Sequence, residues 1–178
     1  MNPIAALIQK LNNASLWEKE MTFERNAFLK EKGRIDTNLY LVTEGSLRIF
    51  VMDAHEEHTI RFGYTNNLIA SLDSFLNEQP SDFYIQALKK TKVKSISKKK
   101  YKAFIESSSE HSALWLQILE NFVLQQMERE RDLLTSSPIE RFQRVVKRSP
   151  QLFQEIPNKY IASYLRMTPE TLSRIKKS

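Results

Sequence analysis

The residues with the most informative chemistry in this sequence lie near its carboxyl end, between Ile156 and Lys177. The spacing of apolar residues predicts two short helices joined by a tight turn, a helix-turn-helix. Thr168 is a hydroxyl cap for the second helix, Pro169 suits its first position, and Glu170 lies near the positive end of its dipole. Polar side chains on the outer faces are able to reach base edges or phosphates. These candidate DNA-binding residues are Lys159, Thr168, Glu170, Thr171, Ser173, Arg174, Lys176 and Lys177.

The positive charge of the chain is concentrated in the same region. Residues 139–178 hold nine basic and three acidic side chains, which accounts for the whole formal net charge of +6, whereas residues 1–138 are balanced. Neutralising a phosphate releases condensed counterions, so this asymmetry favours a nucleic-acid partner. A basic surface that only faces solvent, on a helix pair with no nucleic-acid role, is the competing interpretation.

Composition argues against several other classes of protein. The 178 residues include no cysteine, which excludes disulfides, thiolate metal sites and cysteine nucleophiles. There is no glycine-rich phosphate loop or nucleophile elbow, and the three histidines are scattered, so we expect neither an enzyme nor a metal site. No apolar run approaches the ~18 residues of a membrane span, and the amino terminus lacks a signal-peptide pattern. We expect a cytoplasmic protein with no membrane partner.

The first part of the chain is expected to form a small antiparallel barrel or sandwich behind a short amphipathic helix over residues 3–12. All three glycines fall within residues 33–63, among short β-branched and aromatic runs that predict strands and turns. Alternating apolar residues predict a hairpin over residues 39–51 that turns at Gly45. A lysine-rich run over residues 89–102 predicts a strand and a short helix with solvated lysines outside.

Residues 112–134 contain no glycine or proline and predict one long helix. Its apolar residues cover too much of the circumference for one packing partner. We therefore expect part of this surface to contact the barrel and part to contact the same helix of a second copy, giving a homodimer through residues 112–127. A hydroxyl cap and a proline within residues 135–138 predict a helix stop and restart, which is a candidate domain boundary.

With this layout of barrel, long helix and helix-turn-helix, the chain resembles the Crp/Fnr family of transcription regulators. The residues that carry the resemblance run from Ile161 to Arg174 and have the form I-A-x-x-L-x-M-T-P-E-T-L-S-R. Looser likeness covers Leu39–Ser46 and Glu57–Phe62. The resemblance implies a homodimeric regulator that binds double-stranded DNA. Because the sequence ends directly after the second helix, we expect no β-hairpin wing to add phosphate contacts.

The resemblance also implies a fold and a domain order. The fold is α+β, with a small antiparallel β-barrel of the cyclic-nucleotide-binding jelly-roll type. Residues 1–110 would form this sensor domain, residues 111–135 the dimerisation helix, and residues 136–178 the helix-turn-helix DNA-binding domain.

A ligand pocket in the barrel is a further implication, and its residues depart from the family pattern. Members that bind cyclic nucleotides carry Gly-Glu-Leu for the ribose and Arg-Ser for the cyclic phosphate. The matching positions here are Ala70-Ser71-Leu72 and Ser81-Asp82, and Asp82 would repel a phosphate. We expect no cofactor; the effector is a different small molecule, absent altogether, or cyclic AMP held by unconventional contacts. The candidate pocket residues are Arg61, Ala70, Ser71, Leu72, Ser81, Asp82 and Gln126.

Two assignments stay open at this stage. Gln126 lies where the apolar surface of the predicted long helix ends. Its favoured role is to set the register between two such helices, and the other role is to reach into a neighbouring cavity. For the whole chain, the favoured function is a DNA-binding regulator. The alternative is a module that binds an effector or a partner protein and holds DNA only weakly. Salt dependence distinguishes the two functions, because only DNA binding weakens steeply as salt rises.

Overall fold

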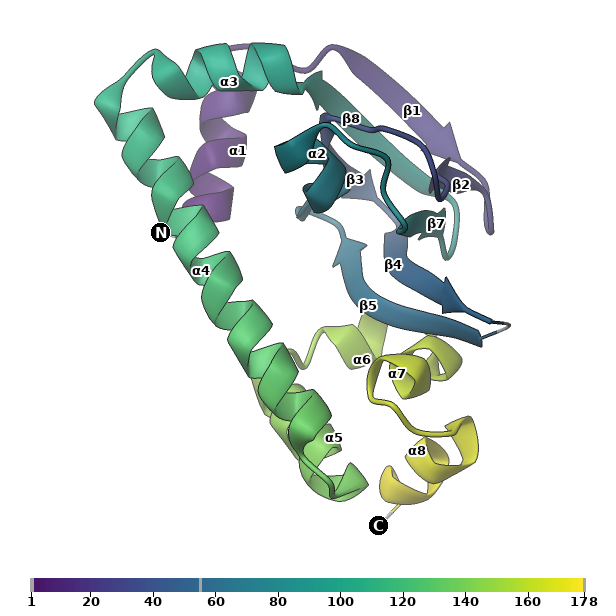
Figure 1. Ribbon diagram of the computed structural model, residues 1–178. Helices are drawn as coiled ribbons and strands as arrows, with labels where there is room; N and C mark the ends of the chain where they lie inside the picture. The colour runs from purple at the N-terminus through teal and green to yellow at the C-terminus, as the bar shows by residue number, and fades with distance from the viewer. Residues whose placement is uncertain (1, 55, 178) are drawn as a thin grey trace.

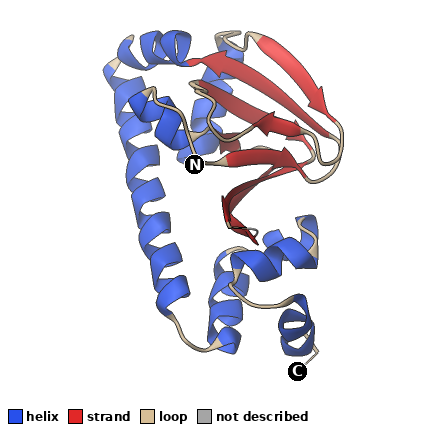
Figure 2. Ribbon diagram, turned by 45° about the vertical axis from the view of Figure 1, so that its right-hand side comes forward, coloured by secondary structure: helices blue, strands red, loops and turns tan. Residues whose placement is uncertain are grey.

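Two four-stranded antiparallel sheets form the amino-terminal part of the structure (Figures 1 and 2). The computed structural model describes residues 2–54 and 56–177. One sheet has the order β1 (Lys19–Phe23), β8 (Thr91–Ser97), β3 (Asn38–Glu44), β6 (Leu68–Ile69). The other has the order β2 (Phe28–Lys30), β7 (Tyr84–Ala87), β4 (Ser46–Asp53), β5 (Glu56–Tyr64). The inner faces of the two sheets share a core that includes Val42, Leu47 and Ile85. The predicted antiparallel β-structure is confirmed.

The predicted hairpin over residues 39–51 is wrong. β3 pairs with β8 and β6, whereas β4 pairs with β5 and β7, so the chain passes from one sheet to the other at Gly45. Gly45 has φ +92°, and a Cβ atom there would lie 2.5 Å from the carbonyl oxygen of Lys90. Only glycine permits this approach. Apolar alternation reports which face of a strand is buried and does not identify the neighbouring strand.

Helices close one end of the two sheets. α1 (Pro3–Asn13), α3 (Lys98–Glu106) and the start of α4 (Ser109–Leu134) pack around a cluster that includes Leu7, Phe75 and Tyr101. The short helix α2 (Leu72–Asn77) lies between β6 and β7 in the chain. The amphipathic helix predicted over residues 3–12 is confirmed. No helix within residues 2–54 and 56–177 is both long and apolar enough to cross a membrane.

The lysine-rich run has the predicted arrangement of a solvated face. β8 and α3 cover residues 91–106, and their buried side chains include Val93, Ile96 and Tyr101. The lysines pair with glutamates across the surface, as in Lys92 with Glu44 at 2.7 Å and Lys94 with Glu20 at 3.0 Å. These lysines therefore form part of a mixed-charge surface.

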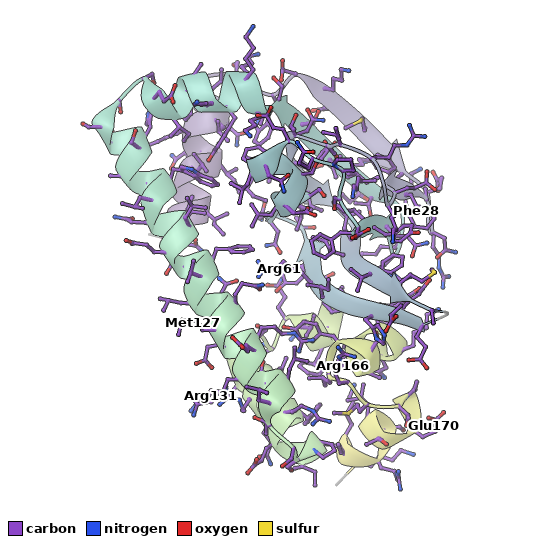
Figure 3. All side chains as sticks on the ribbon, viewed as in Figure 1. Phe28, Arg61, Met127, Arg131, Arg166 and Glu170 are labelled. Carbon is purple, nitrogen blue, oxygen red and sulfur yellow. The ribbon has the colours of Figure 1, made fainter. Side chains whose placement is uncertain are left out.

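The helix α4 has two apolar faces with different environments. It contains 26 residues and is capped by Ser108, whose hydroxyl accepts a hydrogen bond from the backbone N–H of His111. Trp115 and Ile118 pack against the barrel side. The opposite side carries large apolar side chains that are 56% to 60% exposed, and Figure 3 shows Met127 among them, turned away from the barrel. These exposed residues are Leu116, Val123, Leu124 and Met127.

Four shorter helices follow α4. They are α5 (Pro138–Arg148), α6 (Leu152–Glu155), α7 (Asn158–Tyr164) and α8 (Pro169–Ile175). The predicted stop and restart is confirmed: Ser137 caps α5 by accepting a hydrogen bond from the N–H of Glu140, and Pro138 is its first residue. Thr168 caps α8 in the same way by accepting from the N–H of Thr171. Figure 1 shows α6 and α7 lying beside β5.

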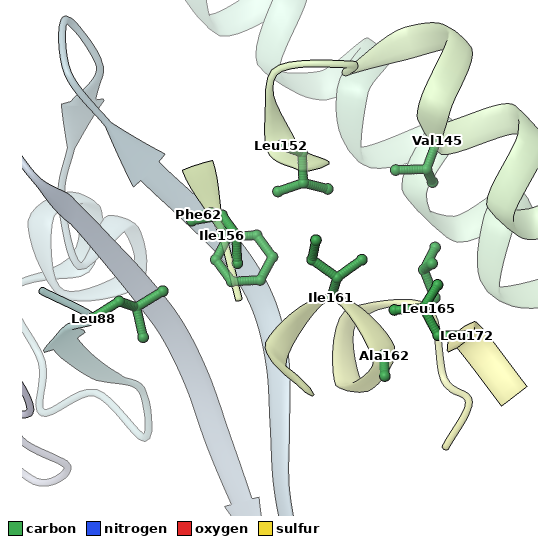
Figure 4. Packing of buried hydrophobic residues seen from close by; sticks show 9 residues of the cluster. All are labelled: Phe62, Leu88, Val145, Leu152, Ile156, Ile161, Ala162, Leu165 and Leu172. Atoms are coloured by element: carbon green, nitrogen blue, oxygen red, sulfur yellow. The ribbon is translucent and has the colours of Figure 1, made fainter. Parts of the chain in front are cut away.

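The carboxyl-terminal helices share their core with the barrel. The cluster joins Phe62 of β5 and Leu88, directly after β7, to apolar residues of α5 through α8 (Figure 4). Ile161, Leu165 and Leu172 are fully buried in it. That residues 136–178 form a separate domain stays a prediction. These residues and the barrel bury part of their surfaces against each other. The buried members from the helices are Val145, Leu152, Ile156, Ile161, Ala162, Leu165 and Leu172.

A candidate nucleic-acid interface and an apolar cavity

The two helices α7 and α8 separate an apolar side from a polar side. Ala162 and Leu172 are buried where the two helices meet. Most of the predicted DNA-binding residues lie on the exposed side, and Figure 3 shows Glu170 at the outer edge of α8. Thr171 is half-buried, and its hydroxyl lies 3.1 Å from the Thr168 hydroxyl. The exposed ones are Lys159, Thr168, Glu170, Ser173, Arg174, Lys176 and Lys177.

Local contacts hold several of these polar groups in place. Lys176 Nζ donates a hydrogen bond of 3.0 Å to Asn158 Oδ1, which ties the end of α8 to the start of α7. The pKa of the Glu170 carboxyl is held below its usual range by a hydrogen bond from its own backbone N–H, by Thr168 and by Arg174. Glu170 is therefore an ionised acceptor at the amino end of α8. Arg174 lies one helical turn further on.

The turn between α7 and α8 is stabilised by an arginine of α5. Arg166 has φ +54°, a left-handed conformation that costs a non-glycine residue roughly 1–2 kcal/mol. Arg141 Nε donates to the carbonyl oxygen of Leu165 at 3.0 Å, and Arg141 Nη1 donates to that of Thr135 at 2.6 Å. One guanidinium thus holds both this turn and the link between α4 and α5.

Two further arginines of α5 are paired with acidic residues of α4. Arg144 Nε lies 2.9 Å from Asp132 Oδ1, and Arg148 pairs with the other oxygen of the same carboxylate. Asp132 is fully buried, and Glu128 lies 2.8 Å from Arg144. The charge count over residues 139–178 therefore overstated the charge available to phosphates, because α4 supplies the balancing acids. Sequence analysis missed this network, since the partners lie in different helices.

A cavity of about 610 Å³ lies between the barrel and α4. Its wall is mostly apolar and comes from the strands and from α1, α2 and α4. The main apolar lining residues are Leu39, Ile49, Ile60, Leu68, Ile69, Leu72, Leu76, Phe83, Trp115, Ile118, Leu119 and Phe122. The polar lining residues are Asn2, Arg61, Asp73, Asn121, Gln125 and Gln126.

Arg61 connects β5 to α4 at this cavity. Its Nη2 donates a hydrogen bond of 2.6 Å to Gln126 Oε1, and its Cζ atom lies 4.0 Å from the centre of the Phe122 ring. Figure 3 shows the side chain between β5 and α4. Burial lowers the pKa of the Arg61 guanidinium from its ordinary value, although it stays charged. Gln126 reaches the cavity, which was the less favoured of its two predicted roles.

Three of the seven predicted pocket residues do not line the cavity. Arg61, Ala70, Leu72 and Gln126 line it, whereas Ser71, Ser81 and Asp82 do not. The two serines are buried in hydrogen bonds within their own segment, and Asp82 is exposed and pairs with Lys32 at 3.1 Å. Matching these positions to the family pattern did not predict where the side chains point, because the backbone conformation of the local turn decides their direction.

The helix α7 is bound to β5 through groups that sequence analysis also missed. Arg48 is only 4% exposed, donates to Gln86 Oε1 at 2.7 Å and pairs with Glu57 at 2.6 Å. Its guanidinium lies between the rings of Phe50 and Tyr160, 4.0 and 4.4 Å from their centres. The alternation of apolar residues in β4 predicts that Arg48 points away from the barrel core. It would face solvent if α7 did not cover it.

Backbone hydrogen bonds add to the contact between α7 and β5. The hydroxyl of Ser163 accepts from the N–H of Thr59 at 3.1 Å and donates to the carbonyl oxygen of Glu57 at 3.0 Å. The Tyr164 ring packs on Phe62 with their centres 5.5 Å apart. Arg129 of α4 lies over the same ring and donates to the Tyr164 carbonyl oxygen. The end of α7 is therefore held by both β5 and α4.

Comparison with known proteins identifies related sequences and folds. Residues 20–108, half of the chain, match the sequence family of the cyclic nucleotide-binding domain. No curated protein sequence matches the chain. A CooA mutant from Carboxydothermus hydrogenoformans is similar in structure, with a TM-score of 0.75 and 14% identity over 96% of this chain and 82% of that one.

Two more solved structures extend this likeness. FixK2 from Bradyrhizobium japonicum has a TM-score of 0.73 and 15% identity, covering 89% of this chain and 82% of its own. The catabolite activator protein of Thermus thermophilus has a TM-score of 0.60 and 19% identity, covering 99% of this chain and 85% of its own. At these identities the similarity establishes the fold, and it extends from the barrel to the last helices.

Proposed function

This chain belongs to the cyclic nucleotide-binding domain family, and we propose that it is a homodimeric transcription regulator of the Crp/Fnr type. The observation that carries the proposal is the exposed polar side of α8, whose opposite side is buried against the rest of the protein. A short helix held in this way is able to enter the major groove of double-stranded DNA. The shared fold with a catabolite activator protein supports the assignment.

Base reading in this proposal comes from Glu170 and Arg174. They lie four residues apart on α8 and project from one face of the helix. Arginine binds guanine through two hydrogen bonds, and a carboxylate accepts one from the amine of cytosine. A two-fold dimer presents the pair twice, so the preferred site is a pseudo-palindrome with a G·C pair in each half-site. The half-sites lie about one or two helical turns apart.

Replacing Arg174 by alanine is expected to weaken binding by roughly 1–3 kcal/mol per half-site and to relax the preference at one guanine. Selection from a random DNA pool measures both the site and its relaxation. Lys177→Ala is the matched control: it should weaken binding to all sequences alike and reduce the salt slope by about one unit per subunit. If selection with the wild-type protein yields no inverted repeat, the assignment of these base readers is wrong. The same holds if Arg174→Ala selects the same sequences as the wild-type protein.

The alternative function is an effector-binding or protein-binding module that holds DNA weakly. The exposed basic side chains of α7 and α8 favour DNA, because within residues 2–54 and 56–177 no carboxylate forms a salt bridge with them, unlike the arginines of α5. The salt dependence of the affinity decides between them. A DNA complex loses affinity with a slope of about 0.9 per neutralised phosphate on logarithmic axes, whereas a protein complex has a shallow slope.

Cyclic AMP is expected not to bind tightly in the cavity. Ser71 and Ser81 occupy the positions of the ribose-binding carboxylate and the phosphate-binding arginine, and neither lines the cavity. Asp82 also lies outside it, so the expectation rests on missing contacts and not on charge repulsion. Isothermal titration calorimetry tests this, with 5′-AMP as the control for non-specific nucleotide binding. A low-micromolar affinity for cyclic AMP alone would show that the pocket is used in an unforeseen way.

A further inference from the structure

The guanidinium of Arg141 bonds to two segments that lie far apart in the sequence. Its Nη1 atom donates to the carbonyl oxygens of Thr135 and Ser136, at 2.6 and 3.2 Å, between α4 and α5. Its Nε and Nη2 atoms donate to the carbonyl oxygens of Leu165 and Arg166, at 3.0 and 3.2 Å, in the turn between α7 and α8. The side chain therefore joins the end of α4 to the turn that precedes α8.

The bonded carbonyl oxygens lie at the carboxyl ends of two helices. Thr135 is the carboxyl cap of α4, and Leu165 is that of α7. The last carbonyl oxygens of a helix have no partner within it and form the negative end of its dipole, so a cation is stabilised there. In the part of the chain that the structure describes, no carboxylate oxygen lies within 4.0 Å of the Arg141 nitrogens. The two helix ends therefore compensate its charge.

The shape of the guanidinium makes this link directional. Its nitrogens lie in one plane and its donors point in fixed directions, unlike those of the lysine ammonium, which rotates freely. Nε and Nη2 form a fork that binds the turn between α7 and α8, whereas Nη1 points to the link between α4 and α5. Because one rigid group binds both segments, neither segment is able to shift against the other without breaking hydrogen bonds.

The turn that Arg141 holds leads directly into the helix that carries the proposed base readers. α8 begins at Pro169, behind the cap Thr168. The exposed apolar face of α4 is the proposed contact with a second copy. In a dimer, the distance between the two α8 helices therefore depends on where each turn lies relative to the end of its own α4. Two-fold symmetry repeats any displacement of the turn in the other copy.

Other contacts hold α7 in place without fixing this turn to the end of α4. The hydroxyl of Ser163 bonds to the backbone of β5, and the Leu165 side chain is fully buried in the shared core. Arg129 binds the Tyr164 carbonyl oxygen from more than one turn before the end of α4. Replacing Arg141 is therefore expected to preserve the fold and to loosen the direction in which α8 begins.

We propose that Arg141 is a positioning residue that sets the separation between the two half-sites accepted by a dimer. The inference rests on the proposed function, because it concerns how two α8 helices reach DNA together. One extra base pair moves a half-site by about 3.4 Å along the DNA and turns it by about 35° around the DNA axis. A rigidly placed pair of helices matches one separation, whereas a loosely placed pair matches several.

The test uses the inverted repeat obtained by selection from a random DNA pool. Its half-sites are moved one or two base pairs closer together or farther apart, and a DNA with a single half-site is included. By fluorescence anisotropy, the wild-type protein is expected to lose at least about tenfold in affinity for each single base-pair change, because the second half-site is then missed. Arg141→Gln should bind all separations within about threefold of one another, and the single half-site within about threefold of the wild-type affinity.

Arg141→Lys distinguishes geometry from charge. Lysine keeps the positive charge but lacks the planar fork, so this variant should discriminate as poorly between separations as Arg141→Gln. The dependence of affinity on salt should stay the same in both variants, because the donors of Arg141 bind carbonyl oxygens and not phosphates. Wild-type discrimination in Arg141→Lys overturns the inference, and so does a salt slope in Arg141→Gln that is lower by about one unit per subunit.

Arg144→Gln is the matched control within α5. Arg144 also bonds to α4, through Asp132 and Glu128, and within the described residues it has no hydrogen bond to the turn before α8. This variant should lower the melting temperature at least as much as Arg141→Gln and keep the wild-type preference for one separation. Circular dichroism measures the melting temperatures. An equal loss of discrimination in Arg144→Gln overturns the inference, because general stability would then set the separation.

The failure of this inference is distinguishable from the failure of the proposed function. If Arg141→Gln binds the repeat and keeps the preference of the wild-type protein, Arg141 does not set the separation and the proposed function stands. The same holds if the wild-type protein binds all separations equally. If Arg141→Gln does not fold, Arg141→Lys decides by the same criterion. A wild-type protein that binds no inverted repeat overturns the proposed function itself.

Discussion

Placing aspartates at Val123 and Met127 is expected to convert the dimer to monomers and to lower the affinity for a two-half-site DNA by roughly 10²–10⁴-fold. Both side chains are more than half exposed. Figure 3 shows Met127 turned away from the barrel, and Val123 lies one helical turn earlier on the same face of α4. Apolar side chains at this spacing bury themselves against the same face of a second helix. Because both half-sites must be engaged together, loss of the dimer removes the gain from simultaneous binding. Sedimentation velocity and fluorescence anisotropy measure the two effects.

The control for this variant adds negative charge elsewhere on α4. Leu134→Asp, at a highly exposed position in the last turn of α4, lies beyond residues 112–127 and so outside the proposed contact. It should leave both the sedimentation coefficient and the DNA affinity close to those of the wild-type protein. A wild-type chain that sediments as a monomer at tens of micromolar contradicts the proposal, and so does a double variant that remains dimeric.

Replacing Asp132 by asparagine is expected to lower the free energy of unfolding by about 3 kcal/mol. The carboxylate is completely buried and is shared by Arg144 and Arg148, whose side chains are 26% and 28% exposed. Asparagine keeps the shape but leaves two partly buried cations facing a neutral group. The partial exposure of the arginines sets the estimate at the lower end of the range for breaking a buried ion pair. For a chain of this length, the melting temperature should fall by about 6–12 °C.

Urea unfolding followed by circular dichroism measures this loss. Glu130→Gln, an exposed carboxylate two residues earlier on α4, is the matched control and should change stability by less than about 0.5 kcal/mol. If Asp132→Asn is as stable as this control, the network between α4 and α5 is not a stabilising feature of the fold.

The helices could be predicted from the sequence because their signals are local. Pro138 and Pro169 start helices behind the hydroxyl caps Ser137 and Thr168, and each cap bonds to a residue three positions ahead. The spacing of buried Ile161 and Leu165 likewise reports one helix face. These features depend on neighbours within a turn or two of the chain, so residue types alone predict them.

The position of the candidate site was predicted only in part. Arg61 and Gln126 were both candidates, but the hydrogen bond between them joins positions 65 residues apart. Ser71 and Ser81 were placed in the pocket by their matching positions, whereas their side chains bond within their own loop. Spacing along a chain does not determine the direction of a side chain in a turn, because the backbone dihedral angles there decide it.

By itself, the sequence determined the leading helix α1, the antiparallel β-structure, the long helix α4 with its apolar surplus, and the caps of α5 and α8. Tertiary structure alone decided that β3 and β4 belong to different sheets, that Arg48 and Asp132 are buried with partners, and that the cavity takes its walls from both β5 and α4. The physical reason is the range of the interaction. Capping and periodicity act between near neighbours, whereas strand pairing, desolvation and ion pairing depend on residues that only the folded chain brings together.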